Sequence, residues 1–145
     1  MIAERSLEIA RPPAEVYAFL LDQDNWAALD PSTMDITPRG AVHEGMTGTI
    51  TRRVAGMRVR DGFLVTELEP ETKMSMRLTG AGYALTETTT LEATPDGTRV
   101  TTVDVFEPTS LAGRLFVAVS GPFIRRDLKA RSERLRSLLE AAPAT

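Results

Sequence analysis

The sequence of 145 residues contains no cysteine and a single histidine. Without cysteine the chain has no disulfides, thiolate nucleophiles or thiol redox chemistry, which suits a reducing compartment such as the cytoplasm. A structural metal site normally draws several histidine or cysteine ligands, so we expect no metal and no cofactor. His43 lies between glycines in residues 39–45 and is expected in an exposed loop, with an acid or base at a cavity mouth as the alternative.

Long apolar runs and an excess of positive charge are also missing. The notable uncharged run, residues 115–124, has ten residues, about half of the roughly 20 that a transmembrane helix needs. The N-terminus becomes charged at Glu4 and Arg5 and does not resemble a signal peptide. The net charge of −3 disfavours nucleic acid as a partner, and we expect no stable insertion into a membrane.

The order of sequence patterns predicts an α+β protein with one domain over residues 1–145. A short strand over residues 2–9 is followed by two short helices, the first beginning near Pro13 and the second passing through Trp26. Residues 34–106 alternate and are cut by glycines and prolines, as in an antiparallel sheet of short hairpins.

A long helix follows the sheet and is expected to run to about residue 142. Gly121 and Pro122 predict a kink or break, because proline removes a helical hydrogen bond, with a continuous helix over residues 123–140. Five apolar residues have spacings that predict one buried stripe. They are Ile124, Leu128, Leu135, Leu138 and Leu139.

Several stretches resemble one known family. Residues 9–22, with Pro12-Pro13, the Asn25-Trp26 pair and Asp30-Pro31, resemble the START-like helix-grip (SRPBCC) superfamily in its polyketide cyclase/dehydrase branch. Residues 67–70 and 106–108 resemble later signposts of that family. The resemblance implies a curved antiparallel sheet of about seven strands, in β-α-α-β-β-β-β-β-β-α order, wrapped around a long C-terminal helix. It also implies a cavity for lipids, polyketides or other apolar molecules. Leu29 stands where the branch often has a second tryptophan.

Strand parity and the implied cavity together give a set of candidate ligand-binding residues. Large aromatic and methionine side chains offer contact area and tolerate variation in a ligand. The alternative is that these residues fill the core. The set is Phe19, Trp26, Phe63, Met74, Met76, Tyr83, Leu85, Thr89, Thr102, Phe106, Phe116 and Phe123.

Two carboxylates share the inward parity. Glu87 lies between Leu85 and Thr89, and Asp104 alternates with the inward positions of the next strand. In an apolar cavity such a pair is suited to general acid and base catalysis of an aldol-type cyclisation or a dehydration. The alternative is that they are hydrated or paired with Arg58, Arg60 or Arg77. Asp61 is a weaker third member.

The last helix is rich in basic residues. An RNA or anionic membrane surface is one interpretation, but the overall acidity and the lack of interleaved aromatics favour the solvated face of an amphipathic helix. The residues concerned are Arg125, Arg126, Lys129, Arg131, Arg134 and Arg136.

Three functions remain compatible with the sequence. The first is a carrier or sensor that binds a small hydrophobic molecule, as a monomer or homodimer. The second is an enzyme of the cyclase, aromatase or dehydratase type that uses the same cavity. The third is a protein-interaction module without a ligand, which requires an exposed apolar patch.

Overall fold

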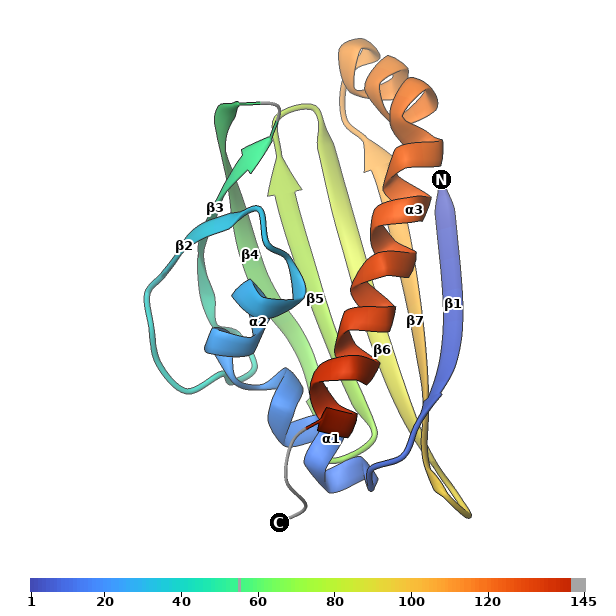
Figure 1. Cartoon of the computed structure of the whole chain (residues 1–145). Coiled ribbons are helices and arrows are strands. Elements are labelled where there is room, and N and C mark those ends of the chain that lie inside the picture. Colours follow the sequence, from blue (N-terminus) through green and yellow to red (C-terminus); the bar gives the residue numbers. More distant parts are fainter. Residues whose placement is uncertain (55, 142–145) are drawn as a thin grey trace.

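Across residues 1–54 and 56–141, which the computed structural model describes, seven strands form one antiparallel sheet in the order β1-β7-β6-β5-β4-β3-β2. Three helices accompany the sheet within the same residues, and the longest lies across its concave face (Figure 1). This arrangement confirms the predicted helix-grip architecture. The elements are β1 (Ile2–Ile9), α1 (Pro13–Leu20), α2 (Gln23–Leu29), β2 (Thr33–Thr37), β3 (Thr47–Val54), β4 (Met57–Glu69), β5 (Lys73–Gly80), β6 (Tyr83–Thr94), β7 (Gly97–Pro108) and α3 (Leu111–Ala141).

The two short helices begin where local chemistry favours it. Pro13 occupies the first turn of α1, where its missing N–H is not needed. The Asp22 carboxylate accepts a hydrogen bond from the backbone N–H of Asp24 and thereby caps α2. Trp26 donates its indole N–H to the carbonyl oxygen of Leu20, 2.8 Å away, which ties α2 to the end of α1.

The strand register determines which side chains share a row across the sheet. Leu78, Leu85 and Phe106 stand at opposed positions on β5, β6 and β7. In the next row, Met76 opposes Glu87, and Glu87 opposes Asp104. Because side chains at opposed positions point to the same face, the carboxylates lie beside apolar rows on the face that α3 covers.

Small residues bring α3 close to the sheet. The helix begins after Ser110, whose hydroxyl accepts a hydrogen bond from the backbone N–H of Gly113 at 2.9 Å. A Cβ at Gly113 would lie 1.7 Å from the carbonyl oxygen of Gly82, so a glycine is required at this approach. The buried stripe comprises Gly113, Val117, Gly121, Leu128, Ser132, Leu135 and Leu139.

The expectation of a kink or break near Pro122 is met as a bend, whereas the expectation for Leu138 needs correction. Pro122 lies inside one uninterrupted helix, and Figure 1 shows that α3 is bent near its start. Leu138 is 39% exposed and lies outside the buried stripe. Leu135 and Leu139 face the protein. Leu138 is adjacent to Leu139 and therefore lies about 100° away from it around the helix axis, toward solvent.

The core divides into clusters on either side of the row that contains Glu87 and Asp104. One cluster lies over β2–β5 and contains Trp26, Phe63, Met74 and Met76. A second lies under α3 and contains Ala3, Phe106, Val117 and Leu128. A third joins both short helices to the C-terminal half of α3 through residues such as Val16, Leu29 and Leu135. Polar side chains therefore occupy the interior where the first two clusters meet.

Candidate functional site

Glu87 and Asp104 occupy directly opposed positions on β6 and β7. The Asp104 side chain has no exposed surface, and the Glu87 side chain is 13% exposed. Their common face is the one that strand parity predicts. Their partners differ from those expected, because Arg58 and Arg60 are exposed and Arg77 lies 3.9 Å from Glu107.

Arginines from β1 and α3 neutralise this carboxylate pair. Arg5 contacts the Oδ2 atom of Asp104 and the hydroxyl of Ser132, and its Nη2 lies 3.9 Å from the Oε2 atom of Glu87. Arg131 places its Nη1 3.3 Å from the same Glu87 oxygen. The pair therefore sits in a nearly closed charge network that draws on four elements, namely β1, β6, β7 and α3.

The two carboxyl groups differ in their affinity for a proton. Burial, followed by the nearby charge of Glu87 and a hydrogen bond with it, raises the pKa of Asp104 to about 7, although Arg5 opposes this shift. Burial would also raise the pKa of Glu87, but Arg131, a hydrogen bond with Asp104 and Arg5 together lower it below its usual range. Near neutral pH, Glu87 carries the charge while Asp104 exchanges the proton.

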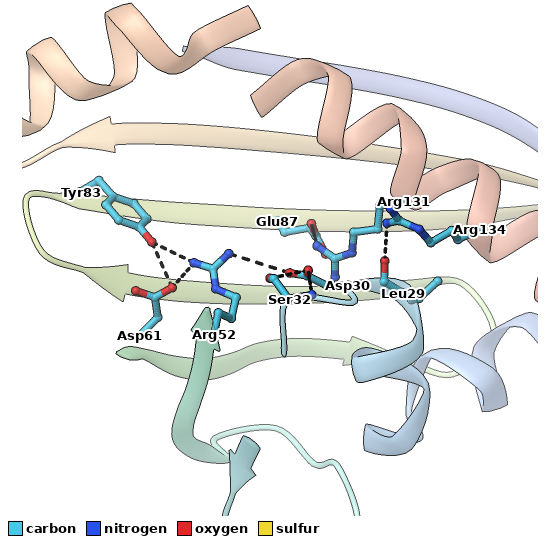
Figure 2. A network of polar contacts seen from close by, with 9 residues as sticks. All are labelled: Leu29, Asp30, Ser32, Arg52, Asp61, Tyr83, Glu87, Arg131 and Arg134. Atoms are coloured by element: carbon cyan, nitrogen blue, oxygen red, sulfur yellow. Dashed lines mark hydrogen bonds and ion pairs between the residues drawn. The ribbon is translucent and has the colours of Figure 1, made fainter. Parts of the chain in front are cut away.

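A second cluster lies toward the other end of the interior, as Figure 2 shows. Asp61 on β4 is completely buried and accepts a hydrogen bond from the hydroxyl of Tyr83 at 3.0 Å. Arg52 contacts Asp61 and donates to the Tyr83 oxygen at 3.2 Å. Burial and then the charge of Asp61 raise the pKa of Tyr83 to about 12, so its hydroxyl remains protonated.

The segment after α2 joins the two clusters. The Oδ2 atom of Asp30 lies 3.9 Å from Nη1 of Arg52, and its charge also raises the pKa of Arg131, after the larger effect of Glu87. Arg134 donates to the carbonyl oxygen of Leu29 at 2.9 Å (Figure 2). Charged groups thus lie in a row from Asp104 to Asp61 between the sheet, α2 and α3, in which Asp30 acts on Arg131 through its charge.

Some hydrogen-bonding capacity in this row is unused within the described residues. The Oδ1 atom of Asp61 and the Nε of Arg52 are buried without a hydrogen-bond partner there. Buried polar atoms are nearly always paired in proteins, so such atoms mark positions where a polar group from a ligand or a water molecule fits. No three His, Cys, Asp or Glu side chains converge in the described part of the chain as a metal site would require.

Most of the predicted apolar set lies in the interior. Trp26 and Phe63 meet edge to face with ring centroids 5.5 Å apart. Thr89 and Thr102 are buried and share a hydrogen bond of 3.4 Å. Other interior members of the set are fully or partly buried, namely Phe19, Met74, Met76, Tyr83, Leu85 and Phe106.

Phe116 and Phe123 do not lie in the interior and correct the prediction. Phe123 is 74% exposed, and Phe116 is 53% exposed and stacks on Tyr83 with ring centroids 6.4 Å apart. The buried stripe of α3 runs through Gly113, Val117 and Gly121, so Phe123 is exposed and Phe116 packs only against the end of β6. His43 lies in an exposed loop, as predicted.

The arginines that complete the site were missed by sequence reasoning, although signals for them exist. Arg5 shares strand parity with Leu7 and Ile9, and Arg52 shares it with Ile50, so both stand at inward positions. Arg131 and Arg134 lie within the turns that carry Leu128 and Leu135. They point into the protein, which corrects the expectation that the basic residues of this helix are all solvated.

Hollows open at the surface beside β1 and beside α1. A groove of about 350 Å³ runs between the edge strand β1 and α3, and Arg5 and Ser132 form part of its wall. It therefore reaches the groups that hold Asp104. A hollow of about 400 Å³ beside α1 and α2 is lined by residues such as Asp24 and Arg39. It contains no member of the charged row, so we assign the chemistry of the site to the interior and the β1–α3 groove.

Solved structures share this fold. Protein CV1439 from Chromobacterium violaceum is 15% identical, with a TM-score of 0.77 over 97% of this chain and 98% of that one. Ara h 8.0201 is 14% identical, with a TM-score of 0.74 over 98% and 99% of the two chains. DynU16, from the dynemicin biosynthetic locus, is 15% identical, with a TM-score of 0.71 over 97% of this chain and 47% of its own.

Sequence comparison gives a match to a family model but none to an individual curated protein. No curated protein sequence matches the chain significantly. The family model described as polyketide cyclase / dehydrase and lipid transport matches residues 2–140. Because that match spans almost the whole sequence and agrees with the helix-grip architecture, the chain belongs to the polyketide cyclase/dehydrase and lipid transport family.

Proposed function

We propose that the protein binds a small molecule with an apolar body and a polar end in the interior between the sheet and α3. The observation that carries this proposal is the charged row from Asp104 to Asp61, set between two apolar clusters. Buried ion pairs contribute little net stability, because desolvation cancels most of their attraction. Their presence is better explained by a ligand whose polar end they orient.

The apolar residues beside the row supply contact area for the body of the ligand. Trp26, Phe63 and Met76 lie on the β2–β5 side of the row, and Leu85 and Phe106 lie on the α3 side. Methionine and aromatic side chains repack around ligands of different shape. We therefore expect moderate selectivity for the body of the ligand and stronger selectivity for its polar end.

The test begins with native mass spectrometry of the purified protein and organic extraction of whatever accompanies it. The recovered compound is then added back while Trp26 fluorescence is recorded. Glu87→Gln removes a charge from the row and is expected to weaken binding about tenfold, as the loss of a charged hydrogen-bonding group does. Glu92→Gln, on the exposed end of the same strand, is the matched control. The proposal fails if Glu87→Gln changes the affinity no more than Glu92→Gln does. It also fails if no compound copurifies and an apolar library leaves Trp26 fluorescence unchanged.

A second candidate is an enzyme of the cyclase or dehydratase type. It is favoured by the different proton affinities of Glu87 and Asp104, the second of which has a pKa of about 7. A protonated Asp104 would donate to a carbonyl oxygen while ionised Glu87 accepts a proton from the adjacent carbon. Conversion of the recovered compound by the native protein but not by Asp104→Asn, with binding retained, would favour the enzyme over the carrier.

A further inference from the structure

The first half of α3 has two apolar faces. Gly113, Val117 and Gly121 face the protein interior. Leu111, Leu115, Val119 and Phe123 follow one another at intervals of four residues, which keeps them on one side of a helix. They are between 66% and 82% exposed. A helix that is apolar on its solvent side as well as its buried side is typical of a surface that something else covers.

The adjoining ends of β3 and β4 repeat this pattern at the same end of the molecule. Figure 1 places these strand ends and the first turns of α3 at one end of the sheet. Val54 ends β3 and is 44% exposed, and Met57 begins β4 and is 66% exposed. We call the exposed apolar residues of α3 and of these two strand ends the apolar end. Its members are Val54, Met57, Leu111, Leu115, Phe116, Val119 and Phe123.

Basic residues accompany both parts of the apolar end. Residues 111–126 contain three arginines and no acidic residue, and residues 53–60 contain three arginines and no acidic residue. Arg53, Arg58, Arg114 and Arg126 are exposed. The whole chain has a net charge of −3, so the positive charge of this end is a local feature. Apolar side chains with flanking arginines match an anionic bilayer, which offers acyl chains beneath negative headgroups.

The same charges argue against a second copy of the chain as the partner. A two-fold symmetric dimer brings the same patch of both copies together, so the arginines of one copy would lie near arginines of the other. Like charges opposed at an interface cost binding free energy. An anionic lipid surface instead satisfies both the apolar and the basic residues.

We propose that the apolar end docks on anionic membranes, with the outer face of the first turns of α3 lying in the headgroup region and Val54 and Met57 making a second contact. The helix lies on the bilayer and does not cross it. No helix in residues 1–54 and 56–141 is long and apolar enough to span a membrane.

Docking at this end has a consequence for the interior. Phe116 belongs to the apolar end and stacks on Tyr83, which also holds Asp61. The side chain of Tyr83 therefore contacts both the docked face, through Phe116, and the charged row, through Asp61. An apolar compound dissolved in the bilayer would meet the protein beside its interior site. This consequence rests on the proposed function, whereas docking itself does not.

The experiment is cosedimentation of the full chain with vesicles of phosphatidylcholine, with and without phosphatidylglycerol. We expect binding to the anionic vesicles that weakens as salt is raised. Leu115→Ser is expected to reduce the binding constant about tenfold. Arg58→Glu is expected to reduce it by roughly fivefold for each unit of charge removed. Both positions are exposed, so the variants should fold, and circular dichroism verifies this.

Matched controls separate docking from general effects. Leu138→Ser changes an exposed leucine at the other end of the same helix, and Arg99→Glu makes the same charge change on β7 away from the apolar end. Both should bind vesicles like the native protein. Docking is refuted if the native protein does not cosediment with anionic vesicles, or if the control variants weaken binding as much as the test variants do. It is also refuted if Leu115→Ser instead dissociates a dimer in light scattering. None of these results depends on a ligand in the interior.

Discussion

Replacing Asp104 with asparagine tests the electrostatic account of the carboxylate pair. The folded protein holds a proton on Asp104 up to a pKa of about 7, compared with 3.8 for an ordinary aspartate. The stabilising effect of this proton is therefore complete below about pH 4 and is lost as the pH rises through 7. Asparagine imitates the protonated form at every pH, so Asp104→Asn should not show this loss.

The size of the effect follows from the shift in pKa. Each unit corresponds to about 1.4 kcal/mol, so the full shift gives an upper limit of about 4 kcal/mol. Glu87 titrates with Asp104, and its lowered pKa acts in the opposite direction at acidic pH. Above pH 5 the effect of Asp104 dominates. We expect the native protein to lose about 2 kcal/mol of unfolding free energy, relative to Asp104→Asn, between pH 5 and pH 8.

Urea denaturation at several pH values measures this difference directly. Urea is preferable to guanidinium chloride, because added salt screens the charges under study. Asp96→Asn, in the exposed turn before β7, is the control and should follow the native curve. Parallel curves for the native protein and Asp104→Asn from pH 5 to pH 8 would refute the assignment of the raised pKa to Asp104.

Three further predictions concern stability. Gly113→Ala should lower the unfolding free energy by about 2–4 kcal/mol in urea titration, since its Cβ would meet the Gly82 carbonyl oxygen. An unchanged midpoint would mean that α3 lies farther from the β5–β6 turn. Thr98→Val should cost about 1–3 kcal/mol, because the buried hydroxyl donates to the carbonyl oxygen of Arg11 at 2.7 Å; a thermal melt identical to the native one would contradict this. Phe123→Ser should change stability by less than about 0.5 kcal/mol, as expected for an exposed side chain, and a large loss in calorimetry would place Phe123 in the core.

Much of the fold was predictable because local chemistry and tertiary packing agree. Pro13 at a first helical turn, the Asp22 cap and the Gly97 turn each act within a few residues, and the structure contains all three elements. Alternation along β6 and β7 predicted that Glu87 and Asp104 share a face. That prediction needs only the two-residue period of a strand and the hairpin between the strands.

The partners of the carboxylates were beyond local reasoning. Arg5 is separated from Asp104 by 99 positions and Arg131 from Glu87 by 44. Their contacts depend on which strand pairs with β7 and on the height at which α3 crosses the sheet. An arginine at an inward position indicates that a buried anion exists, but it does not say which one.

What the sequence determined by itself is the order of elements, the strand faces and the family resemblance, because these follow from short-range periodicity and turn chemistry. What only the tertiary structure decided is the rotation of α3. Residues 111–124 are apolar on both sides, so their pattern is compatible with either face against the sheet. The close approach of Gly113 to Gly82 selects one face. That contact turns Arg131 inward and leaves Phe123 exposed, and so places both the charged row and the apolar end.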